Sequence, residues 1–432
     1  MPVTADAAHP TGSIQAPCDI ICPMEIAEII HEMAVKARAA AAELRKLTTE
    51  EKNAMLLKIA DALEAAKPAI DAANAEDVAV AKGNGLSPAM VDRLTLTDSR
   101  FKSMVDGVRY VAQLPDPVGE TIWTRERPSG IRICKTREPF GVVAVVFESR
   151  PNVFVDTAAL CLKTGNAIIL RGGKEAIRSN MALAKAVREA FGSSLIDHHS
   201  SLDHAVQLVE VLDHAAVAEM VRAVGLIDVA IPRGGERLIR AMCEAALIPV
   251  LKHYKGVCHV YVDDKADLPM ALSILHNAKV QRPSACNAAE CLLVHEKLAP
   301  ILLPMVRAWA EDQKVTLHET DQDWEREFLA LEMNVGIVSD YRAAIAHINR
   351  YASHHSDCIV TNDADRAKEF LRDVDSACVY HNVSTRFTDG AEFGMGAEIG
   401  ISTDKLHARG PMGLEELTTY KYTVTGDGVI RA

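Results

Sequence analysis

The sequence predicts an α/β protein with parallel sheets, and two patterns lead to this fold class. From Gly141 onward, short apolar runs such as GVVAVVF and AIILR alternate with runs whose apolar residues recur at helical spacing. This βαβα order is typical of parallel sheets that are covered by helices on both faces. The part before it, from Met24 to Leu114, has helical spacing almost throughout, and an extended pair of runs separates the two parts.

The helical first quarter carries recognisable start signals. Thr48 and Glu51 have the spacing of a capping box. Pro68 suits the first turn of the following helix, and Asp98 is expected to cap a helix that ends before Pro115. These signals predict a row of consecutive helices at the start of the chain.

The alternating part gives a series of expected elements. Residues 152–163 and 175–191 have helical spacing, and the runs IPVLKHY and CHVYVD, within 248–263, are expected to be extended. The run NAAECLLV, which begins at Asn287, is expected to start a helix. The runs TIWTRE and IRICKTRE, separated by a Pro-Ser-Gly turn, predict a hairpin.

The length of 432 residues is enough for two or three domains. A loose arm is expected at the N-terminus, because little periodicity occurs there. The arm is expected over 1–23 and a nucleotide-binding domain over 24–120 and 138–252. A catalytic domain is expected over 253–412, and a subunit-pairing element over 121–137 and 413–432.

Charge and hydropathy argue against two classes of partner. The 47 Lys and Arg residues against 59 Asp and Glu give a net charge of −12, which disfavours nucleic acid and anionic membrane surfaces. No apolar run approaches the roughly 20 residues of a spanning helix, and no charged signal segment opens the chain. The ten cysteines include no C-x-x-C pair, which favours a reducing cytosol over a disulfide framework. The histidines have no zinc-site spacing, so no metal centre is expected.

Two strand ends carry glycines beside cations. They read ILRGGK and IPRGGE, and the residues concerned are Arg171, Gly172, Gly173, Lys174, Arg233, Gly234 and Gly235. Parallel sheets bind ligands at the carboxyl ends of their strands, and glycine lets the backbone approach a phosphate closely. The alternative is that each Gly-Gly pair only makes a tight strand-to-helix turn. No G-x-G-x-x-G fingerprint is present.

Six motifs carry a family resemblance. They occur in the order FESRPNV, ILRGGKEAIRSN, QRPSACNAAE, HINRYASHHSD, NVSTRFTDGAEFGMGAEIGIST and GPMGLEELTTYKY. Together they resemble the gamma-glutamyl phosphate reductases of the aldehyde dehydrogenase superfamily, from about residue 24 to the end, with small departures at Ala352 and His381. The resemblance implies an aldehyde dehydrogenase-like fold: a Rossmann-type cofactor domain, an α/β catalytic domain and a small β oligomerisation element.

The resemblance also implies an activity. Such enzymes reduce L-glutamyl 5-phosphate with NADPH to L-glutamate 5-semialdehyde and phosphate, the second step from glutamate toward proline. We therefore expect a cytoplasmic, NADP-dependent homodimer or dimer of dimers with a small-molecule substrate. Transient contact with glutamate 5-kinase is a further expectation, because acyl phosphates are labile. The alternatives are another aldehyde dehydrogenase, hydrolytic or CoA-acylating, and an inactive partner of the kinase.

The resemblance places the nucleophile at Cys286. The expected helix after it would put Cys286 near a helix N-terminus, which favours a thiolate, and Lys279 and Arg282 add positive charge. Asn152 is the expected oxyanion donor, although an ungapped alignment puts Arg150 at that place. The alternative is that Asn152 caps a helix.

Hydrolytic relatives carry a glutamate base shortly before the catalytic domain. Here that place reads VLKHYKG, with Lys252 where the glutamate would fall. An enzyme that releases phosphate should lack this base, because activated water would destroy the thioester.

The cofactor residues are also assigned by resemblance. Arg171 matches a lysine that reaches the adenosine ribose, and Lys174 falls where NAD-preferring relatives carry a glutamate, so NADP is favoured. Residues 233–235 would approach the pyrophosphate or adenine. Glu327 resembles the glutamate that holds the nicotinamide ribose, with a solvated helix acid as the alternative.

The α-amino and α-carboxylate groups of the substrate need an acid and a base. The candidates, chosen by position, are Glu148, Arg282, Asn382, Ser384 and Arg386. Ordinary surface salt bridges are the alternative reading.

Overall fold

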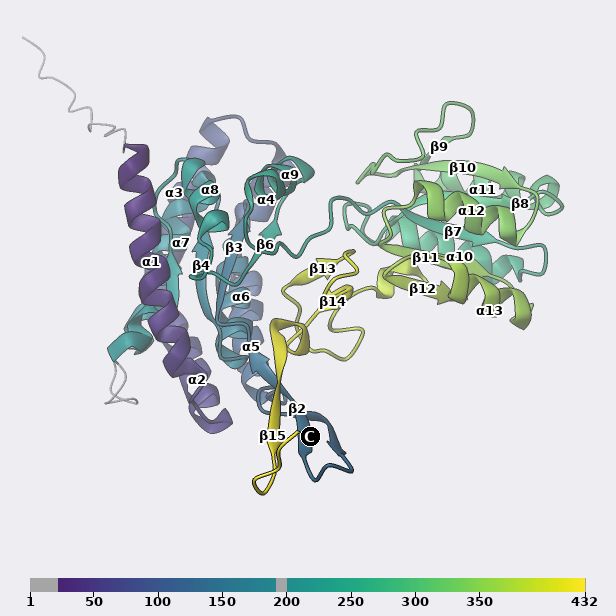
Figure 1. Ribbon diagram of the computed structural model, residues 1–432. Coiled ribbons are helices and arrows are strands. Elements are labelled where there is room, and N and C mark those ends of the chain that lie inside the picture. Colours follow the sequence, from purple (N-terminus) through teal and green to yellow (C-terminus); the bar gives the residue numbers. More distant parts are fainter. Residues whose placement is uncertain (1–21, 192–199, 432) are drawn as a thin grey trace, which may run out of the picture.

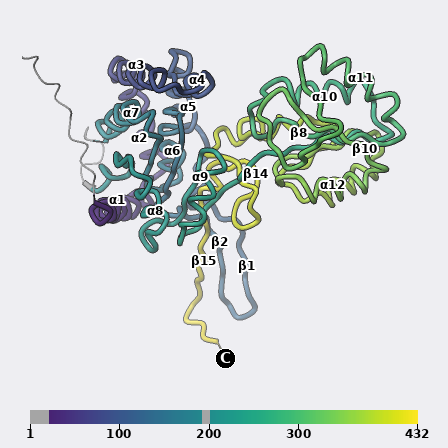
Figure 2. Tube along the Cα trace, turned by 90° about the horizontal axis from the view of Figure 1, so that it is seen from above, coloured from purple at the N-terminus to yellow at the C-terminus, as the bar shows by residue number. Residues whose placement is uncertain are grey.

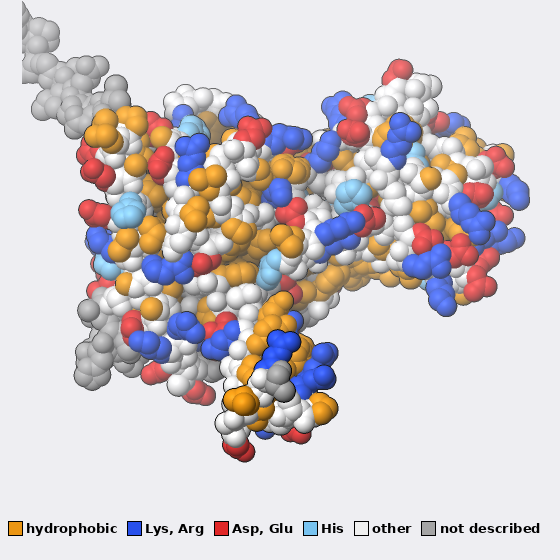
Figure 3. All heavy atoms as spheres, in the orientation of Figure 1, with side chains coloured by type: hydrophobic (Ala, Val, Ile, Leu, Met, Phe, Trp, Pro, Cys, Tyr) orange, Lys and Arg blue, Asp and Glu red, His pale blue; other side chains and the backbone are white. Residues whose placement is uncertain are grey.

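The computed structural model describes residues 22–191 and 200–431, which form two lobes joined by a narrow waist (Figure 1). The expected N-terminal arm falls almost wholly on residues 1–21, outside the described part. Within that part, no helix combines the length and apolar character that crossing a bilayer requires. On the face drawn in Figure 3, Lys and Arg are interspersed with Asp and Glu instead of forming one basic patch.

The first quarter is helical, as predicted. It forms α1 (Pro23–Leu44), α2 (Thr49–Ala65), α3 (Lys67–Gly83), α4 (Pro88–Leu94) and α5 (Asp98–Gln113). The capping box is confirmed, since the Thr48 hydroxyl accepts the Glu51 N–H and the Glu51 carboxylate accepts the Thr48 N–H. The cap predicted at Asp98 is wrong by one residue, because the Thr97 hydroxyl accepts the Arg100 N–H.

The first lobe contains a parallel sheet. Its order is β5 (Val206–Leu208), β4 (Ala167–Arg171), β3 (Val142–Phe147) and β6 (Val229–Arg233). Helices α1 and α8 (Ala215–Arg222) lie on one face, α6 (Asn152–Lys163) and α7 (Ile177–Phe191) lie on the other, and α9 (Glu236–Ala245) follows β6 (Figure 2). Every residue of β3 and β4 is buried, as coverage on both faces requires. Because β3, β4 and β6 run the same way, the loops after them meet at one edge.

The second lobe contains another parallel sheet. Its order is β12 (Cys378–His381), β11 (Ser356–Val360), β7 (Cys258–Val262), β8 (Ala289–His295), β10 (Glu332–Val338) and β9 (Thr316–His318). Helices α10 (Leu268–Val280) and α11 (Ala299–Gln313) cover one face, and α12 (Tyr341–Tyr351) and α13 (Ala364–Asp373) cover the other (Figure 2). The α/β class with parallel sheets is thereby confirmed.

Two expected elements of this region are wrong. NAAECLLV does not begin a helix, because Ala289–His295 is the buried strand β8. IPVLKHY is not a strand: Val250 forms one isolated bridge to Ala230, and the chain from Leu251 to Val257 has no regular structure. This irregular segment passes between the lobes (Figure 1).

Two small antiparallel sheets complete the fold. The predicted hairpin forms from β1 (Thr121–Glu126) and β2 (Arg132–Pro139), and β15 (Thr418–Thr425) pairs with β2. This three-stranded sheet projects away from both lobes (Figure 1). Strands β13 (Gly400–Ser402) and β14 (Gly410–Met412) pair beside the waist.

Candidate active site

Cys286 lies in the loop between α10 and β8, at the amino edge of the second sheet. Its backbone packs tightly on the waist: a Cβ on Gly256 would lie 1.8 Å from the Cys286 carbonyl oxygen. The Cys258 thiol donates to the same oxygen across 3.3 Å. The loop is thus held by backbone contacts that leave the Cys286 side chain partly exposed.

Burial separates Cys286 from most cysteines of the described residues. Cys161, Cys258, Cys291, Cys358 and Cys378 are buried. Burial raises the pKa of the Cys258 thiol well above its ordinary value and that of Cys358 to about 12. These thiols stay protonated and inert near neutral pH, whereas Cys286 faces the waist.

The electrostatic surroundings of Cys286 differ from the prediction. No helix follows it, so no helix N-terminus contributes positive charge. Lys279 is fully buried and turned inward, with its Nζ 2.8 Å from the Glu290 carboxylate. Arginines supply the charge instead, since Arg150 and Arg386 both interact electrostatically with Cys286.

Arg150 belongs to the loop after β3, on the opposite side of the waist. Burial, together with repulsion from Arg93, Arg233 and Arg282, lowers the pKa of its guanidinium to about 10. Within the described residues the guanidinium has no hydrogen-bond or ion-pair partner. An unpaired, half-buried cation facing a cysteine is suited to bind an anion.

Asn152 lies in the first turn of α6, and its side chain is engaged within that helix. Its side-chain amide donates to the Asp156 carboxylate across 2.9 Å. Burial raises the pKa of Asp156 to about 6. Asn152 does not cap the helix, because Pro151 occupies the N-cap position. Its role as oxyanion donor stays a prediction.

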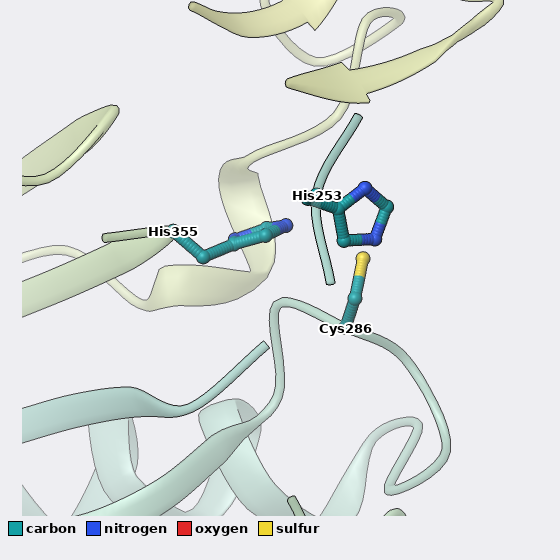
Figure 4. A group of neighbouring side chains, drawn as sticks. All are labelled: His253, Cys286 and His355. Atoms are coloured by element: carbon teal, nitrogen blue, oxygen red, sulfur yellow. The ribbon is translucent and has the colours of Figure 1, made fainter. Parts of the chain in front are cut away.

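Two histidines near Cys286 were missed from the sequence. The Cys286 sulfur, one ring nitrogen of His253 and one of His355 all lie within 4.8 Å of one another (Figure 4). His253 adjoins Lys252, the residue at the expected base position, and His355 lies in the motif HINRYASHHSD. That shared motif could have directed attention to His355, whereas periodicity gave no signal for either residue.

The turn after β4 places the first group of cofactor candidates at the carboxyl edge of the first sheet. Arg171 is buried, with its Nη2 2.7 Å from the Leu212 carbonyl and its Nε without a partner. Burial lowers the pKa of Arg171. Lys174 is exposed, and a Cβ on Gly173 would clash with the Glu175 carboxylate at 2.2 Å. Gly172 is equally confined, since a Cβ there would lie 2.1 Å from the Asn180 amide nitrogen.

The turn after β6 holds the second group. The Gly235 N–H donates to the Glu148 carboxylate across 2.9 Å, so Glu148 lies at the N-terminus of α9. A Cβ on Gly234 would lie 2.7 Å from the same carboxyl group. Arg233 packs against Gly400 of β13. Glu148 therefore occupies the place where a phosphate was expected.

The remaining candidates lie in two places: Asn382 follows the carboxyl end of β12, at the edge of the sheet opposite Cys286, whereas Arg282 and Arg386 lie by the loop that carries Cys286. Both groups of the Asn382 amide bond the Thr361 backbone at 2.9 Å, and buried Ser384 caps a short helical turn. Arg386 donates from Nε to Gln281 across 2.8 Å and also bonds Asn287. Arg282 is exposed beside them.

Glu327 lies in an irregular segment, not on the helix considered from the sequence. Its carboxylate accepts the Gly256 N–H across 2.7 Å, and burial raises its pKa. Gly256 packs against the backbone of Cys286, so Glu327 contacts a residue that itself contacts Cys286.

A thiol, imidazoles and unpaired guanidinium groups therefore lie together at the waist. The waist separates the second lobe from the carboxyl edge of the first sheet, where the cofactor candidates lie. A thiol can attack an activated carbonyl, and guanidinium groups can hold the leaving anion.

Comparison with known proteins agrees with this chemistry. Residues 21–325 match the model of the aldehyde dehydrogenase family. The gamma-glutamyl phosphate reductase of Carboxydothermus hydrogenoformans is 50% identical over 92% of this chain and 98% of its own length. That of Geotalea daltonii is 47% identical over 94% of this chain and 100% of its own length.

Solved structures give the same relationship. The gamma-glutamyl phosphate reductase of Thermotoga maritima superposes with a TM-score of 0.90 at 42% identity, over 93% of this chain and 100% of its own. An acetylating aldehyde dehydrogenase of Geobacillus thermoglucosidasius, at 15% identity and a TM-score of 0.67 over 95% of this chain and 98% of its own, shares the fold. The chain belongs to the gamma-glutamyl phosphate reductases of the aldehyde dehydrogenase family.

Proposed function

We propose that this enzyme reduces L-glutamyl 5-phosphate to L-glutamate 5-semialdehyde and phosphate, using NADPH and a thioester on Cys286. The observation that carries the proposal is the partly exposed Cys286 thiol, which interacts electrostatically with the unpaired Arg150 guanidinium of the loop after β3. The family membership supplies the substrate. The reaction would be the second step from glutamate toward proline, in the cytoplasm.

The chain's own residues account for the first half of the reaction. The Cys286 sulfur attacks the acyl carbon, a sulfur–carbon bond forms, and the phosphate leaves with the electron pair of its carbon–oxygen bond. Arg150 and Arg282 are positioned to bind the departing phosphate, while Arg386 is held by Gln281 and Asn287 near the substrate. Asn152 remains the expected oxyanion donor.

The residues at the carboxyl edge of the first sheet fit a phosphorylated dinucleotide. Arg171 has an Nε without a partner, Lys174 is exposed, and no acid replaces it. We propose that these cations with residues 172, 173 and 233–235 hold NADPH, and that Glu327 reaches the nicotinamide ribose. When bound, NADPH supplies the hydride that reduces the thioester. Glu148 would release the Gly235 N–H if the pyrophosphate occupied that helix N-terminus.

The waist lacks the acid that a hydrolytic relative would use. Lys252 stands there, and its Nζ lies 3.0 Å from both oxygens of Asp404, so it is directed toward β13. A hydrolytic or CoA-acylating aldehyde dehydrogenase is the alternative function. It predicts turnover that does not need phosphate.

The decisive assay follows NADP reduction on L-glutamate 5-semialdehyde, with and without inorganic phosphate, and with CoA or water as the only acceptor. We expect turnover only with phosphate. A rate that ignores phosphate, or that requires CoA, would reject the proposed reaction.

We also propose that the β1–β2–β15 sheet joins subunits into a homodimer or dimer of dimers. Its exposed faces carry Trp123, Tyr420 and Tyr422, whose rings contact one another. Light scattering on the intact chain and on a Tyr420→Glu, Tyr422→Glu variant tests this, with loss of assembly expected in the variant. Transient contact with glutamate 5-kinase stays a separate expectation, testable by co-sedimentation.

A further inference from the structure

The Cys286 thiol has an imidazole beside it that no part of the proposed reaction has used so far. The sulfur points at the His253 ring, and one nitrogen of that ring lies within 4.8 Å of it (Figure 4). His253 belongs to the irregular segment between the lobes, which is held by backbone hydrogen bonds at Leu251 and Lys252 and by the contact of the His253 ring with β13. A nucleophile and a neighbouring base in this relation are the first two parts of a covalent catalytic site.

The third part is a group that orients the base. His253 Nδ1 lies 2.8 Å from the backbone carbonyl of Ile401 in β13. A carbonyl oxygen only accepts hydrogen bonds, so Nδ1 carries the proton of the neutral ring. Nε2 therefore presents its lone pair, and Figure 4 shows the other ring nitrogen turned from the strands toward the sulfur. The Ile401 carbonyl fixes both the tautomer and the direction of the ring.

His355 is the competing imidazole, and its environment excludes it. It is fully buried, and its Nδ1 lies 2.8 Å from the Ser356 hydroxyl, while Nε2 has no partner. Burial lowers the pKa of His355 to about 4, so this ring stays neutral near pH 7 and cannot hold a transferred proton. His253 is only half-buried and has the waist on one side.

Arginine side chains from separate segments lie near the pair. Arg150 follows β3, Arg282 lies in the loop before β8, and Arg386 lies in the short helical turn after β12. Titratable and charged groups surround the pair. On other elements they are Arg150, Arg282, Arg386, Cys258, His355, Glu327 and Glu398. On the segment of His253 they are Lys252 and Tyr254. Cationic surroundings of this kind are typical of reactive cysteines.

We propose that His253 is the general base that removes the proton of the Cys286 thiol, with the Ile401 carbonyl as its orienting group. The inference rests on the proposed role of Cys286 as nucleophile. In the step, the sulfur–hydrogen bond breaks, a bond from Nε2 to hydrogen forms, and the electron pair stays on sulfur. The sulfur then attacks the acyl carbon as thiolate, and the imidazolium remains beside the departing anion.

The test measures alkylation of Cys286 by iodoacetamide from pH 5.5 to 9.5, without substrate or cofactor. Peptide mass spectrometry follows Cys286 alone, and the Cys286→Ser protein gives the background. A free cysteine is only about 1% thiolate at pH 6.5, so losing the base should slow alkylation there by roughly 10- to 100-fold. We expect this slowing in His253→Gln, with recovery to nearly the wild-type rate at pH 9.5.

His355→Gln is the matched control, because it changes the other imidazole of the same cluster. We expect it to keep the wild-type pH profile. The proposal fails if His253→Gln also keeps the wild-type profile, if it is slowed by the same factor at every pH, or if His355→Gln alone loses the reactivity. Since alkylation needs neither glutamyl phosphate nor NADPH, an error in the assigned substrate would leave this result intact and appear only in the phosphate assay.

Discussion

Lowering the pH should destabilise the second lobe through His355, which is fully buried just before β11. Burial lowers the pKa of its imidazole from 6.5 to about 4. The unfolded chain takes up a proton near pH 6.5, whereas the folded protein does not until about pH 4. The contribution to stability is therefore complete above pH 6.5 and is lost, by about 1.4 kcal/mol per pH unit, as the pH falls toward 4. Between pH 7.5 and 5 the loss amounts to about 2 kcal/mol.

Urea unfolding at these two pH values, on wild-type protein and on His355→Gln, isolates this group. Glutamine keeps a polar side chain beside the Ser356 hydroxyl but does not titrate. The buried His259 and the half-buried His347 are present in both proteins, so their titration cancels in the difference. We expect the variant to lose about 2 kcal/mol less than the wild type over this range. Equal losses would show that the folded protein protonates His355 as easily as the unfolded chain does.

Three further predictions concern single side chains. Cys286→Ser should abolish phosphate-dependent turnover while leaving NADPH binding, measured by fluorescence titration, within twofold. Arg150→Met should lower kcat/KM by about 100-fold or more, and Arg150→Lys should lose less, because the lysine keeps the charge opposite the leaving phosphate. Lys279→Met should lower the free energy of unfolding by about 3–5 kcal/mol at pH 8, because it leaves the buried Glu290 carboxylate without its ion-pair partner. Adding Glu290→Leu should recover most of that loss in urea unfolding; a double variant as unstable as Lys279→Met would contradict the reasoning.

Local patterns were enough to predict most elements of the first lobe. Residues 152–163 form α6 with the predicted bounds, because Gly165 ends the helix and the apolar residues before it pack on a sheet that is buried on both faces. The alternation of strand and helix also predicted parallel sheets correctly. Sequence order and apolar spacing suffice for such units, since each strand and its helix are neighbours along the chain.

The segment from Cys286 into β8 could not be predicted from local patterns. NAAECLLV contains good helix formers, yet from Ala289 onward it belongs to β8, a central strand between β7 and β10. Glu290 is tolerated there only because Lys279, on α10, reaches it inside the lobe. The pairing of residues on separate elements overrides local preference, and no spacing rule within eight residues reveals it.

Because a strand and not a helix follows Cys286, a helix N-terminus cannot activate its sulfur. A helix N-terminus would have been a property of the loop itself, available to any cysteine at its start. In its absence, the groups that can act on Cys286 come from distant segments: Arg150 from the edge of the first sheet, and His253 from the waist with its ring held by Ile401. On the proposed roles, Cys286 is therefore fully activated only when the two lobes and β13 are assembled. A chain whose lobes have not assembled would keep only the reactivity of an ordinary exposed cysteine.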